Sequence, residues 1–472
     1  MSYIRINKHY VQLPHLYLGL VELLLLMVAA HAAQLLVAAA SAHLSEFDLV
    51  AKPSASSTLL FALVMSCCTQ AMGVYGALLR EGFLSLVLRV LVSFFLLGCA
   101  SLFVLNLVLP KPILSSAGVF WGILFSGLLV IPARVFFLKL VDLSQLRRRI
   151  LLFGAGTKAQ KLLDEIGPEI SSLGIEVAGC IHCPNETLAV DPQLVVPEPS
   201  DWLAYVRQSK ISQIVVCPDE RRRDINAAFP LVDLLDCKLA GVPATEVCGF
   251  YERELGKIDL TSLQPSWMLF SDGFNNSKRA RIVKRLCDMV LACGFFAVLW
   301  PLMLLTAIAV RLESPGPVLY HQLRVGYNGR IFRIYKFRSM RQDAEKAGAQ
   351  WATKNDSRIT RVGAFIRNTR LDELPQLFNV VSGSMSFVGP RPERPEFVTE
   401  LEQQIPFYGL RHKVKPGLMG WAQLKYPYGA SVEDARHKLQ YDLYYTKNHS
   451  FMIDVLIMIQ TVEIILLGKG VR

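Results

Sequence analysis

Charged side chains are scarce in this sequence. Only 19% of its 472 residues are Asp, Glu, Lys or Arg, whereas 52% are hydrophobic. An ordinary soluble protein carries more charge, so these proportions exclude that class and indicate a membrane protein. Acids are the scarcer sign, and the net charge of +11 favours contact with anionic lipid. The length is sufficient for a membrane part and two soluble domains.

A disulfide framework is also missing. The ten cysteines are scattered, and Cys67 and Cys68 fall inside a predicted membrane span. Cys180 and Cys183 form a CxxC motif with His182 between them, but no partner pair completes a zinc site. Zinc binding and a redox pair are the alternatives. We expect free thiols, because a domain that faces the cytosol is kept reduced.

Four segments near the N-terminus are long and apolar enough to cross a hydrocarbon core of about 30 Å. They are Leu16–Ala40, Thr58–Leu79, Phe83–Leu109 and Ala117–Leu140. No cleavage site of small residues clearly follows the first apolar run, so we expect a retained anchor rather than a cleaved signal peptide. The sequence therefore predicts a four-helix transmembrane region over residues 1–147.

Positive residues in short loops predict the orientation of these spans. Arg5 and Lys8 precede the first span, Arg80 separates the second from the third, and residues 147–149 after the fourth are all arginine. These loops should face the cytoplasm, and the acidic loop 41–57 should face outward.

Three ionisable residues lie inside or near the predicted spans. They are Glu22, Arg89 and Arg134. Such residues can mark a lipid or proton path, but they also pair within a helix bundle or extend toward the membrane surface. We expect pairing or extension, because all three fit near a span end.

Residues 148–250 read as a Rossmann-like α/β module. An apolar strand at 150–153 leads into the glycine turn Gly154–Ala159 and then a helix through Ile166. Further apolar strands at 175–179 and 214–217 support a small parallel sheet. A dinucleotide site needs an acid at the end of the second strand, where this chain has Cys180 to Cys183. NAD binding is therefore the less favoured alternative.

The densest cluster of chemically useful residues lies between Ile366 and Val398. Asp372 and Glu373 are adjacent acids at a predicted helix start, with Pro375 in the first turn. Leucines and a phenylalanine repeat on one apolar face of this predicted helix: Leu371, Leu374, Leu377 and Phe378. An isolated acid pair is more often a simple acidic helix N-terminus.

The arginines around this pair change that interpretation. Arg370 precedes the acids, and Arg391 and Arg394 follow in the proline-rich run Gly389–Pro395. Prolines restrict the backbone, and guanidinium groups offer forked donors to phosphate. A carboxylate can attack phosphorus only where the negative charge of both is offset. The block therefore indicates an anion site with a candidate carboxylate nucleophile.

Several blocks in one order resemble the bacterial sugar transferases, the polyprenyl-phosphate glycosyl-1-phosphate transferases that are also called monotopic phosphoglycosyl transferases. Besides the acid block they are Ser314–Val318, Lys336–Met340 and Val414–Gln423. The resemblance runs from about Lys278 to the C-terminus and implies an α+β catalytic domain over 278–472, after a linker at 251–277. The N-terminal half resembles the large form of the family, with four spans and a Rossmann-like module.

A fifth apolar segment, 286–310, lies between cationic residues and has Pro301 in its middle, where the ring removes a helix hydrogen bond. Its length fits another span. Four spans return the chain to the cytoplasm, however, so a full crossing would place the acids away from cytosolic nucleotide sugars. We expect a re-entrant membrane helix bent at Pro301, which the resemblance also implies.

The resemblance implies the following roles. Asp372 attacks the β-phosphorus of a UDP-sugar, UMP leaves, and Glu373 binds Mg²⁺. Undecaprenyl phosphate then takes the phosphosugar, the first membrane step of exopolysaccharide, capsule or O-antigen synthesis. The remaining residues with a predicted substrate-binding role are Lys336, Arg338, Arg370, Arg391, Pro392, Arg394 and, on weaker grounds, Asp442.

The expected location is the bacterial inner membrane, with the catalytic domain on its cytoplasmic face. Membrane lipid, downstream glycosyltransferases and a homo-oligomer are compatible partners, and nucleic acid is not expected. Two other functions stay open. One is a membrane-anchored NAD-dependent sugar-modifying enzyme, and the other is a non-enzymatic scaffold for polysaccharide assembly. No residue identifies the sugar.

Overall fold

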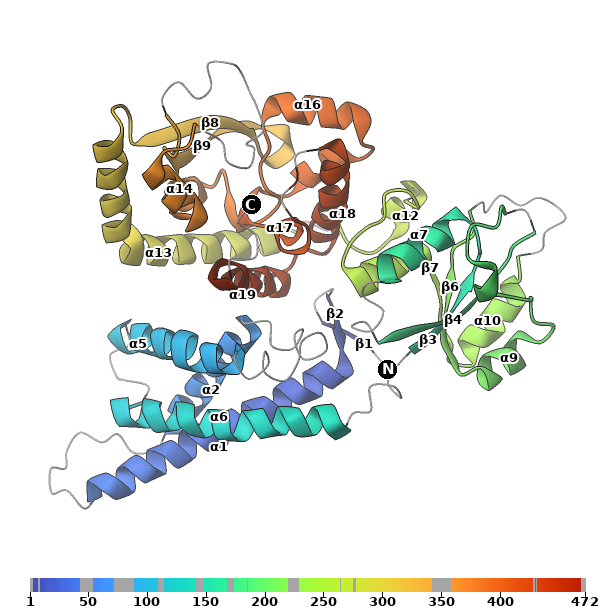
Figure 1. Ribbon diagram of the computed structural model, residues 1–472, viewed down its shortest axis with the longest axis horizontal. Coiled ribbons are helices and arrows are strands. Elements are labelled where there is room, and N and C mark those ends of the chain that lie inside the picture. The colour runs from blue at the N-terminus through green and yellow to red at the C-terminus, as the bar shows by residue number, and fades with distance from the viewer. Residues whose placement is uncertain are drawn as a thin grey trace. The chain divides into compact units, whose positions relative to one another are not determined.

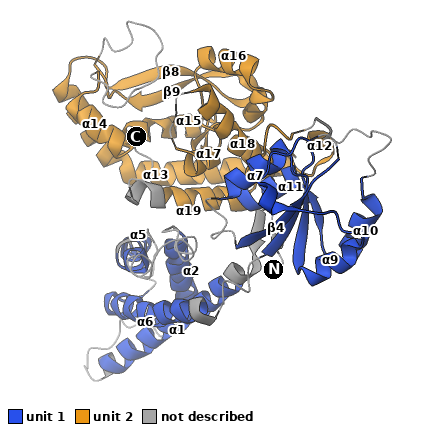
Figure 2. Ribbon diagram, turned by 45° about the vertical axis from the view of Figure 1, so that its right-hand side comes forward, with its two compact units in different colours: residues 1–6, 10–255 blue, residues 7–9, 256–472 orange. Residues whose placement is uncertain are grey.

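The structure is a computed structural model that describes residues 3–6, 9–42, 54–71, 89–108, 114–140, 148–167, 174–184, 186–219, 229–263, 265–274, 277–341, 358–427, 429 and 431–467. Two compact units make up the chain (Figure 2). The first contains Met1–Ile6 and Tyr10–Leu255, and the second contains Asn7–His9 and Gly256–Arg472.

Apolar helices dominate the N-terminal part of the first unit. After the short strands β1 and β2 they follow in the order α1, α2, the π-helix η1, α5 and α6. Their bounds are β1 Tyr3–Ile6, β2 His9–Gln12, α1 Leu13–Ala42, α2 Ala55–Ala71, η1 Val92–Gly98, α5 Cys99–Val108 and α6 Ser116–Leu140. By length and composition, the stretches Tyr17–Ala40 and Ser116–Phe137 can cross a membrane, whereas Ala55–Gln70 and Arg89–Phe103 are shorter apolar helices.

The first and fourth predicted spans therefore coincide with helices of sufficient length. The second and third coincide only in part with shorter helices, and residues 72–88 between these lie outside the described residues. Four complete spans stay a prediction.

Glu22 on α1 and Arg134 on α6 form a buried ion pair. The Arg134 guanidinium donates to both carboxylate oxygens, with Nη2 2.7 Å from Oε2. Around them the helices pack through apolar side chains such as Phe61, Met65 and Phe94. An isolated charge in an apolar bundle is costly, and pairing offsets that cost. Pairing within the bundle is confirmed for these two residues.

The rest of the first unit is a parallel α/β module. Its five-stranded sheet has the order β5-β4-β3-β6-β7, and every neighbouring pair is parallel. Figure 1 shows α7 on one side of the sheet and α9 and α10 on the other. The bounds are β3 Arg148–Phe153, α7 Thr157–Ile166, β4 Ile175–Ile181, β5 Val195–Val196, α9 Trp202–Gln208, β6 Ile211–Val216, α10 Leu231–Leu239, β7 Ala244–Glu246, α11 Val247–Phe250 and the π-helix η4 Tyr251–Leu255. The predicted parallel sheet is confirmed.

The second unit mixes helices with short strands around one large apolar core. Its elements are α12 Pro265–Phe270, α13 Lys278–Glu313, β8 Leu319–Val325, η5 Tyr327–Gly329, β9 Ile331–Phe337, α14 Arg361–Asn368, η6 Leu371–Gln376, α15 Leu377–Ser382, β10 Ser386–Val388, α16 Pro395–Gln404, η7 Tyr408–Lys413, β11 Gly417–Met419, α17 Trp421–Lys425, α18 Val432–Asn448 and α19 Phe451–Leu467. Strands β8 and β9 pair antiparallel across the 3₁₀ turn η5, and β10 and β11 pair parallel. The core includes Val380, Phe387, Leu443 and Tyr444.

Two details of the C-terminal part bear on the sequence predictions. Apolar and aromatic residues at helical spacing predict one amphipathic helix over 432–465, but the structure has two helices there, because His449 leaves the helical conformation with ψ 129° and ends α18. From the sequence we favour packing of Trp421 over a place at the membrane interface, and the structure buries it inside the unit. Its indole Nε1 donates to the Gly256 carbonyl at 2.7 Å and its ring stacks on Tyr444.

Helix α13 is continuous through Pro301 and bends visibly in Figure 1, where its two halves run at an angle. Both ends are fixed to the same unit. Near its start, Asp288 accepts hydrogen bonds from the Ser386 hydroxyl and the Phe387 amide of β10. At its end, the Glu313 carboxylate accepts from the Val362 amide and caps α14.

Candidate active site

The acid pair lies in η6, directly after a sharp turn. Arg370 adopts the left-handed conformation, with φ 59°, between α14 and η6, and the Glu373 amide donates to its carbonyl. Few non-glycine residues adopt this conformation, which marks a constrained turn. The predicted α-helix start is instead a 3₁₀ segment with Pro375 inside it, and α15 follows. Leu377 is buried as expected, but Phe378 is exposed on the other side.

Glu373 is held by two cations. Its Oε1 lies 2.9 Å from the Lys336 Nζ and 3.2 Å from an Arg391 Nη2. Burial opposes ionisation of this carboxyl, but the charges of Lys336 and Arg391 outweigh it and hold its pKa well below the usual value. Glu373 is therefore an anion at neutral pH, and both bonds end on one of its two oxygens.

Asp372 differs from Glu373 in its surroundings. Among the described residues it has no hydrogen-bond or ion-pair partner, although its side chain is largely buried. Burial and the adjacent Glu373 charge raise the pKa of Asp372, while Lys336, Arg367 and Arg391 act in the opposite direction. An unpaired carboxylate beside cations is suited to nucleophilic attack, because no hydrogen bond must break first.

Asn379 of α15 places Lys336 against this segment. Its amide Nδ2 donates to the Arg333 carbonyl at 2.7 Å, and its Oδ1 accepts from the Tyr335 amide at 3.1 Å. These bonds fasten the exposed edge of β9 to α15, directly beside η6. Burial lowers the pKa of Lys336, although the Glu373 charge opposes this shift.

The segment that carries Arg391 is anchored by close backbone contacts between two glycine-proline blocks. The Gly389 amide donates to Met419, and the Gly417 amide donates to Pro390. A Cβ on Gly389 would lie 2.1 Å from the Lys415 carbonyl oxygen, and one on Gly417 would lie 2.1 Å from the Gly389 nitrogen. Only glycine permits this approach. The two blocks recognised in the sequence therefore support one loop.

A buried ion pair that the sequence did not reveal supports the same loop. Arg411 of η7 donates to the Arg391 carbonyl at 2.9 Å and to the Tyr408 hydroxyl at 2.6 Å, and it pairs with Asp442 at 2.7 Å. Burial raises the pKa of Asp442 to about 6, although Arg411 acts against this shift. Asp442 was singled out as a weak substrate-binding candidate. The structure places it behind the Arg391 loop, with Arg411 between them.

The other predicted ligands are held in different ways. The Arg338 guanidinium is buried and donates to the Ser314 and Pro315 carbonyls and to the Ser314 hydroxyl. Arg394 lies over the Phe397 ring. The Pro392 carbonyl accepts from Arg324, a contact that sequence reasoning also missed. Anion binding by Arg338, Pro392 and Arg394 stays a prediction. The sequence predicts that the polar segment 344–352 covers the site, and this segment lies outside the described residues.

The acid pair offers a partial Mg²⁺ site. The described residues contain no group of three or more His, Cys, Asp or Glu that could hold a metal by themselves. Mg²⁺, however, is often bound by one or two carboxylates together with substrate phosphates. Glu373 Oε2, which neither cation bond uses, and Asp372, which has no partner within the described ranges, fit that arrangement. The residues present are therefore compatible with a metal that arrives with a diphosphate.

The glycine turn of the α/β module is filled by the chain itself. Asp219 accepts from the Thr157 and Lys158 amides at the start of α7, at 2.8 and 2.9 Å. Glu186 accepts from the Ala155 and Asp219 amides. Such amides are the groups that bind the pyrophosphate in a dinucleotide fold. Their occupation by carboxylates counts against NAD binding there.

All ten cysteines are free thiols, as expected.

Comparison with known proteins decides the family. A model of the family described as bacterial sugar transferase matches residues 279–468. The UDP-glucose:undecaprenyl-phosphate glucose-1-phosphate transferase of Escherichia coli K12 is 42% identical over 328 residues, which are 67% of this chain and 67% of that protein. The chain belongs to the bacterial sugar transferase family.

Other members of the family differ in the sugar that their names carry. A UDP-N-acetylgalactosamine-undecaprenyl-phosphate N-acetylgalactosaminephosphotransferase of Aeromonas hydrophila is 45% identical over 239 residues, 51% of this chain. A UDP-glucose:undecaprenyl-phosphate glucose-1-phosphate transferase of Xanthomonas campestris is 35% identical over 299 residues, 61% of this chain. The matches span 56% and 60% of these two relatives. The family match contains the whole acid block and its loop.

Proposed function

We propose that this bacterial sugar transferase moves a sugar 1-phosphate from a UDP-sugar to undecaprenyl phosphate, as the initiating membrane step of a surface polysaccharide. The observation that carries the proposal is the contrast within the acid pair. Glu373 is neutralised by Lys336 and Arg391, whereas Asp372 beside it has no hydrogen-bond or ion-pair partner in the described part of the chain. The named activities of the relatives support the same reaction class.

In the first half-reaction an Asp372 carboxylate oxygen attacks the β-phosphorus of the UDP-sugar. The bond between that phosphorus and the oxygen that bridges to the α-phosphate breaks, and UMP leaves with the electron pair. In the second, an oxygen of undecaprenyl phosphate attacks the same phosphorus and the bond to Asp372 breaks. The product is undecaprenyl-diphosphate-sugar, and the carboxylate is regenerated. Lys336 and Arg391 would offset the charge that both steps bring together.

The attachment of α13 supports the re-entrant arrangement as part of this proposal. Lys284 near its start pairs with Asp454 at 2.5 Å, and Glu313 at its end caps α14. Both contacts lie in one compact unit. A helix that crossed the whole membrane would place its two ends on opposite sides, whereas a helix bent at Pro301 can return to the same face. That face would be the cytoplasmic one, where UDP-sugars are available.

We also propose Mg²⁺ as the cofactor, held by Glu373 Oε2 and the diphosphate of the donor. The metal would neutralise the diphosphate and so favour attack by an anion. In lipid, the full-length protein should release UMP from a UDP-sugar only with Mg²⁺, and EDTA should abolish release. For Glu373→Gln the Mg²⁺ concentration at half-maximal rate should rise about tenfold. Release of UMP at an unchanged rate in EDTA would remove the metal from the proposal. A panel of UDP-sugars in this assay identifies the donor.

The acidic side of the pH profile tests the charges around Asp372. Attack requires the ionised carboxylate, and Lys336 is one of the groups that lowers the pKa of Asp372. In Lys336→Met this pKa rises, so the acid limb of kcat/KM for the UDP-sugar should move to higher pH. The plateau should also fall by about 10²-fold, because a charge that faces the diphosphate is lost. Lys336→Arg keeps the charge and should keep the limb. An unmoved limb in Lys336→Met would contradict this electrostatic assignment.

A further inference from the structure

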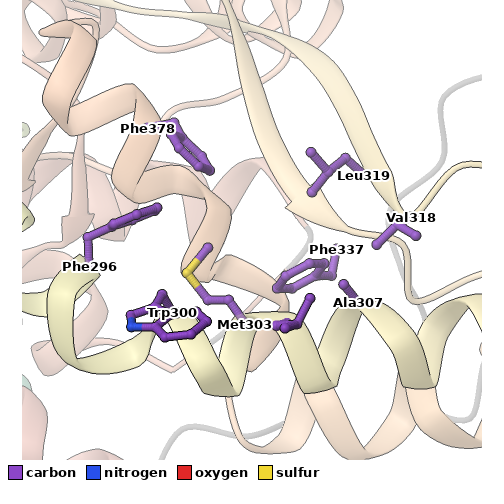
Figure 3. A pocket seen from close by; sticks show the side chains of 9 residues that line it. Phe296, Trp300, Met303, Ala307, Val318, Leu319, Phe337 and Phe378 are labelled. Atoms are coloured by element: carbon purple, nitrogen blue, oxygen red, sulfur yellow. The ribbon is translucent and has the colours of Figure 1, made fainter.

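An open apolar groove lies between α13, β8, β9 and α15. Its volume is about 500 Å³, and nearly all of its lining is hydrocarbon or aromatic. Figure 3 shows Phe296, Trp300 and Met303 rising from α13 toward Phe378, Leu319 and Phe337. Met303 and Phe337 are buried and form the floor, whereas Trp300 and Leu319 are 54% and 43% exposed at the rim. An exposed apolar surface of this kind is typical of ligand-binding grooves and of contacts with a membrane or another protein.

The groove adjoins the segment that carries the acid pair. Leu371 and Leu374, which flank Asp372 and Glu373, pack against the cluster of Met303 and Phe337 that forms the groove floor. Phe378 belongs to α15, which begins directly after η6. Phe337 follows Lys336, the residue that binds Glu373. A ligand whose phosphate lay at the acids could therefore lay an attached hydrocarbon chain along this groove.

The fourth side of the groove is α13, one of the three helices long and apolar enough to cross a membrane among the described residues. Its groove residues Phe296, Trp300 and Leu304 are 37%, 54% and 53% exposed. The groove therefore opens along a helix surface that lipid can reach. A hydrocarbon chain can enter the groove from the bilayer without passing through water. Its apolar surface is therefore never exposed to water, and the free-energy cost of such exposure is avoided.

We propose that this groove binds the first isoprenoid units of the polyprenyl phosphate acceptor. The inference rests on the proposed function and names where the acceptor chain lies. It assigns acceptor recognition to Leu304 and Trp300 of α13, Leu319 of β8 and Phe378 of α15. We prefer the acceptor to an acyl chain of a bulk phospholipid as the occupant of the groove. The reaction requires the phosphate of the acceptor to lie at Asp372, and η6, which carries Asp372, packs beside the groove.

Two matched pairs of variants test the groove. Leu319 of β8 lines it, whereas Leu323 on the same strand is equally apolar, 50% exposed and outside it. Leu304 and Leu305 form the corresponding pair on α13, and Leu305 is 64% exposed. For Leu319→Ser and Leu304→Ser we expect the KM for undecaprenyl phosphate to rise about tenfold, with the KM for the UDP-sugar within about twofold of the wild type. Leu323→Ser and Leu305→Ser should leave both within about twofold.

Exchange of labelled UMP into the UDP-sugar pool, without acceptor, separates this inference from the proposed function. If the wild type shows no exchange, the covalent half-reaction fails. If exchange occurs but the acceptor KM is the same in all four variants, the groove inference alone is overturned. A photoreactive polyprenyl phosphate should label peptides from α13 and β8, and undecaprenyl phosphate should compete. Labelling by a photoreactive phosphatidylglycerol that undecaprenyl phosphate does not displace would assign the groove to bulk lipid and overturn the inference.

Discussion

Asp372→Asn, purified in lipid, is expected to lose UMP release by at least about 10⁴-fold, the order seen when a single nucleophile is removed. The amide has nearly the shape of the carboxylate, and Asp372 has no hydrogen-bond or ion-pair partner among the described residues, so folding should be little affected. What disappears is the anion that forms the bond to phosphorus. Both half-reactions should fail together, because each makes or breaks that bond.

Trapping provides a direct measurement of the intermediate. When the wild type is incubated with a UDP-sugar that carries labelled β-phosphate and then quenched, the label should stay on the peptide that contains residue 372, at up to one equivalent. Glu400→Gln, an exposed acid on α16, serves as the control and should keep full labelling. Near-normal UMP release by Asp372→Asn, or label on another side chain, would show that the nucleophile lies elsewhere.

Much of this site could be predicted because its signals are local in the chain. The antiparallel strands β8 and β9 follow from two apolar runs around a glycine-containing turn. The charged character of the block follows from Asp372, Glu373 and Arg391, and the structure brings Glu373 and Arg391 together with Lys336. The sequence could not predict that Asp372 and Glu373 have different surroundings. The pairing of one acid and the isolation of the other depend on how β9 lies against η6.

Contacts between residues far apart in the chain could not be predicted from the sequence. Asp442 could be marked as unusual, but its partner Arg411 lies in a different element, and no spacing relates the two. In the same way, the sequence gives no sign that the backbone amides after Gly154 are already occupied. Asp219, which occupies two of them, follows a strand much later in the chain. Phe378 has helical spacing to Leu371 and Leu374, yet it is exposed while Leu377 beside it is buried, and the 3₁₀ segment that precedes α15 breaks the single helical repeat that the spacing predicts.

Arg411→Met is expected to lower the free energy of unfolding by about 3–5 kcal/mol, because it leaves Asp442 buried without a partner. Both side chains of this pair are nearly inaccessible, at 6% and 2% relative exposure. The more accessible pair of Arg436 and Glu433 on α18, at 35% and 65% relative exposure, is the control, and Arg436→Met should cost no more than about 1 kcal/mol. Thermal or denaturant unfolding of the protein in detergent provides the measurement, and equal losses in the two variants would contradict the assigned burial.

The double variant Arg411→Met/Asp442→Leu then separates stability from positioning. Replacing both charges by apolar groups removes the buried unpaired carboxylate, so most of the lost stability should return. The Arg391 carbonyl still lacks its donor, so the loop that presents the Arg391 guanidinium to Glu373 is held less firmly. A small misplacement of a positioning group can cost about 10²-fold in rate. We therefore expect a stable protein whose kcat is about 10- to 100-fold lower at nearly unchanged KM for the UDP-sugar. Full activity in this variant would mean that Arg411 supports only folding, because Arg391 would then be placed correctly without it.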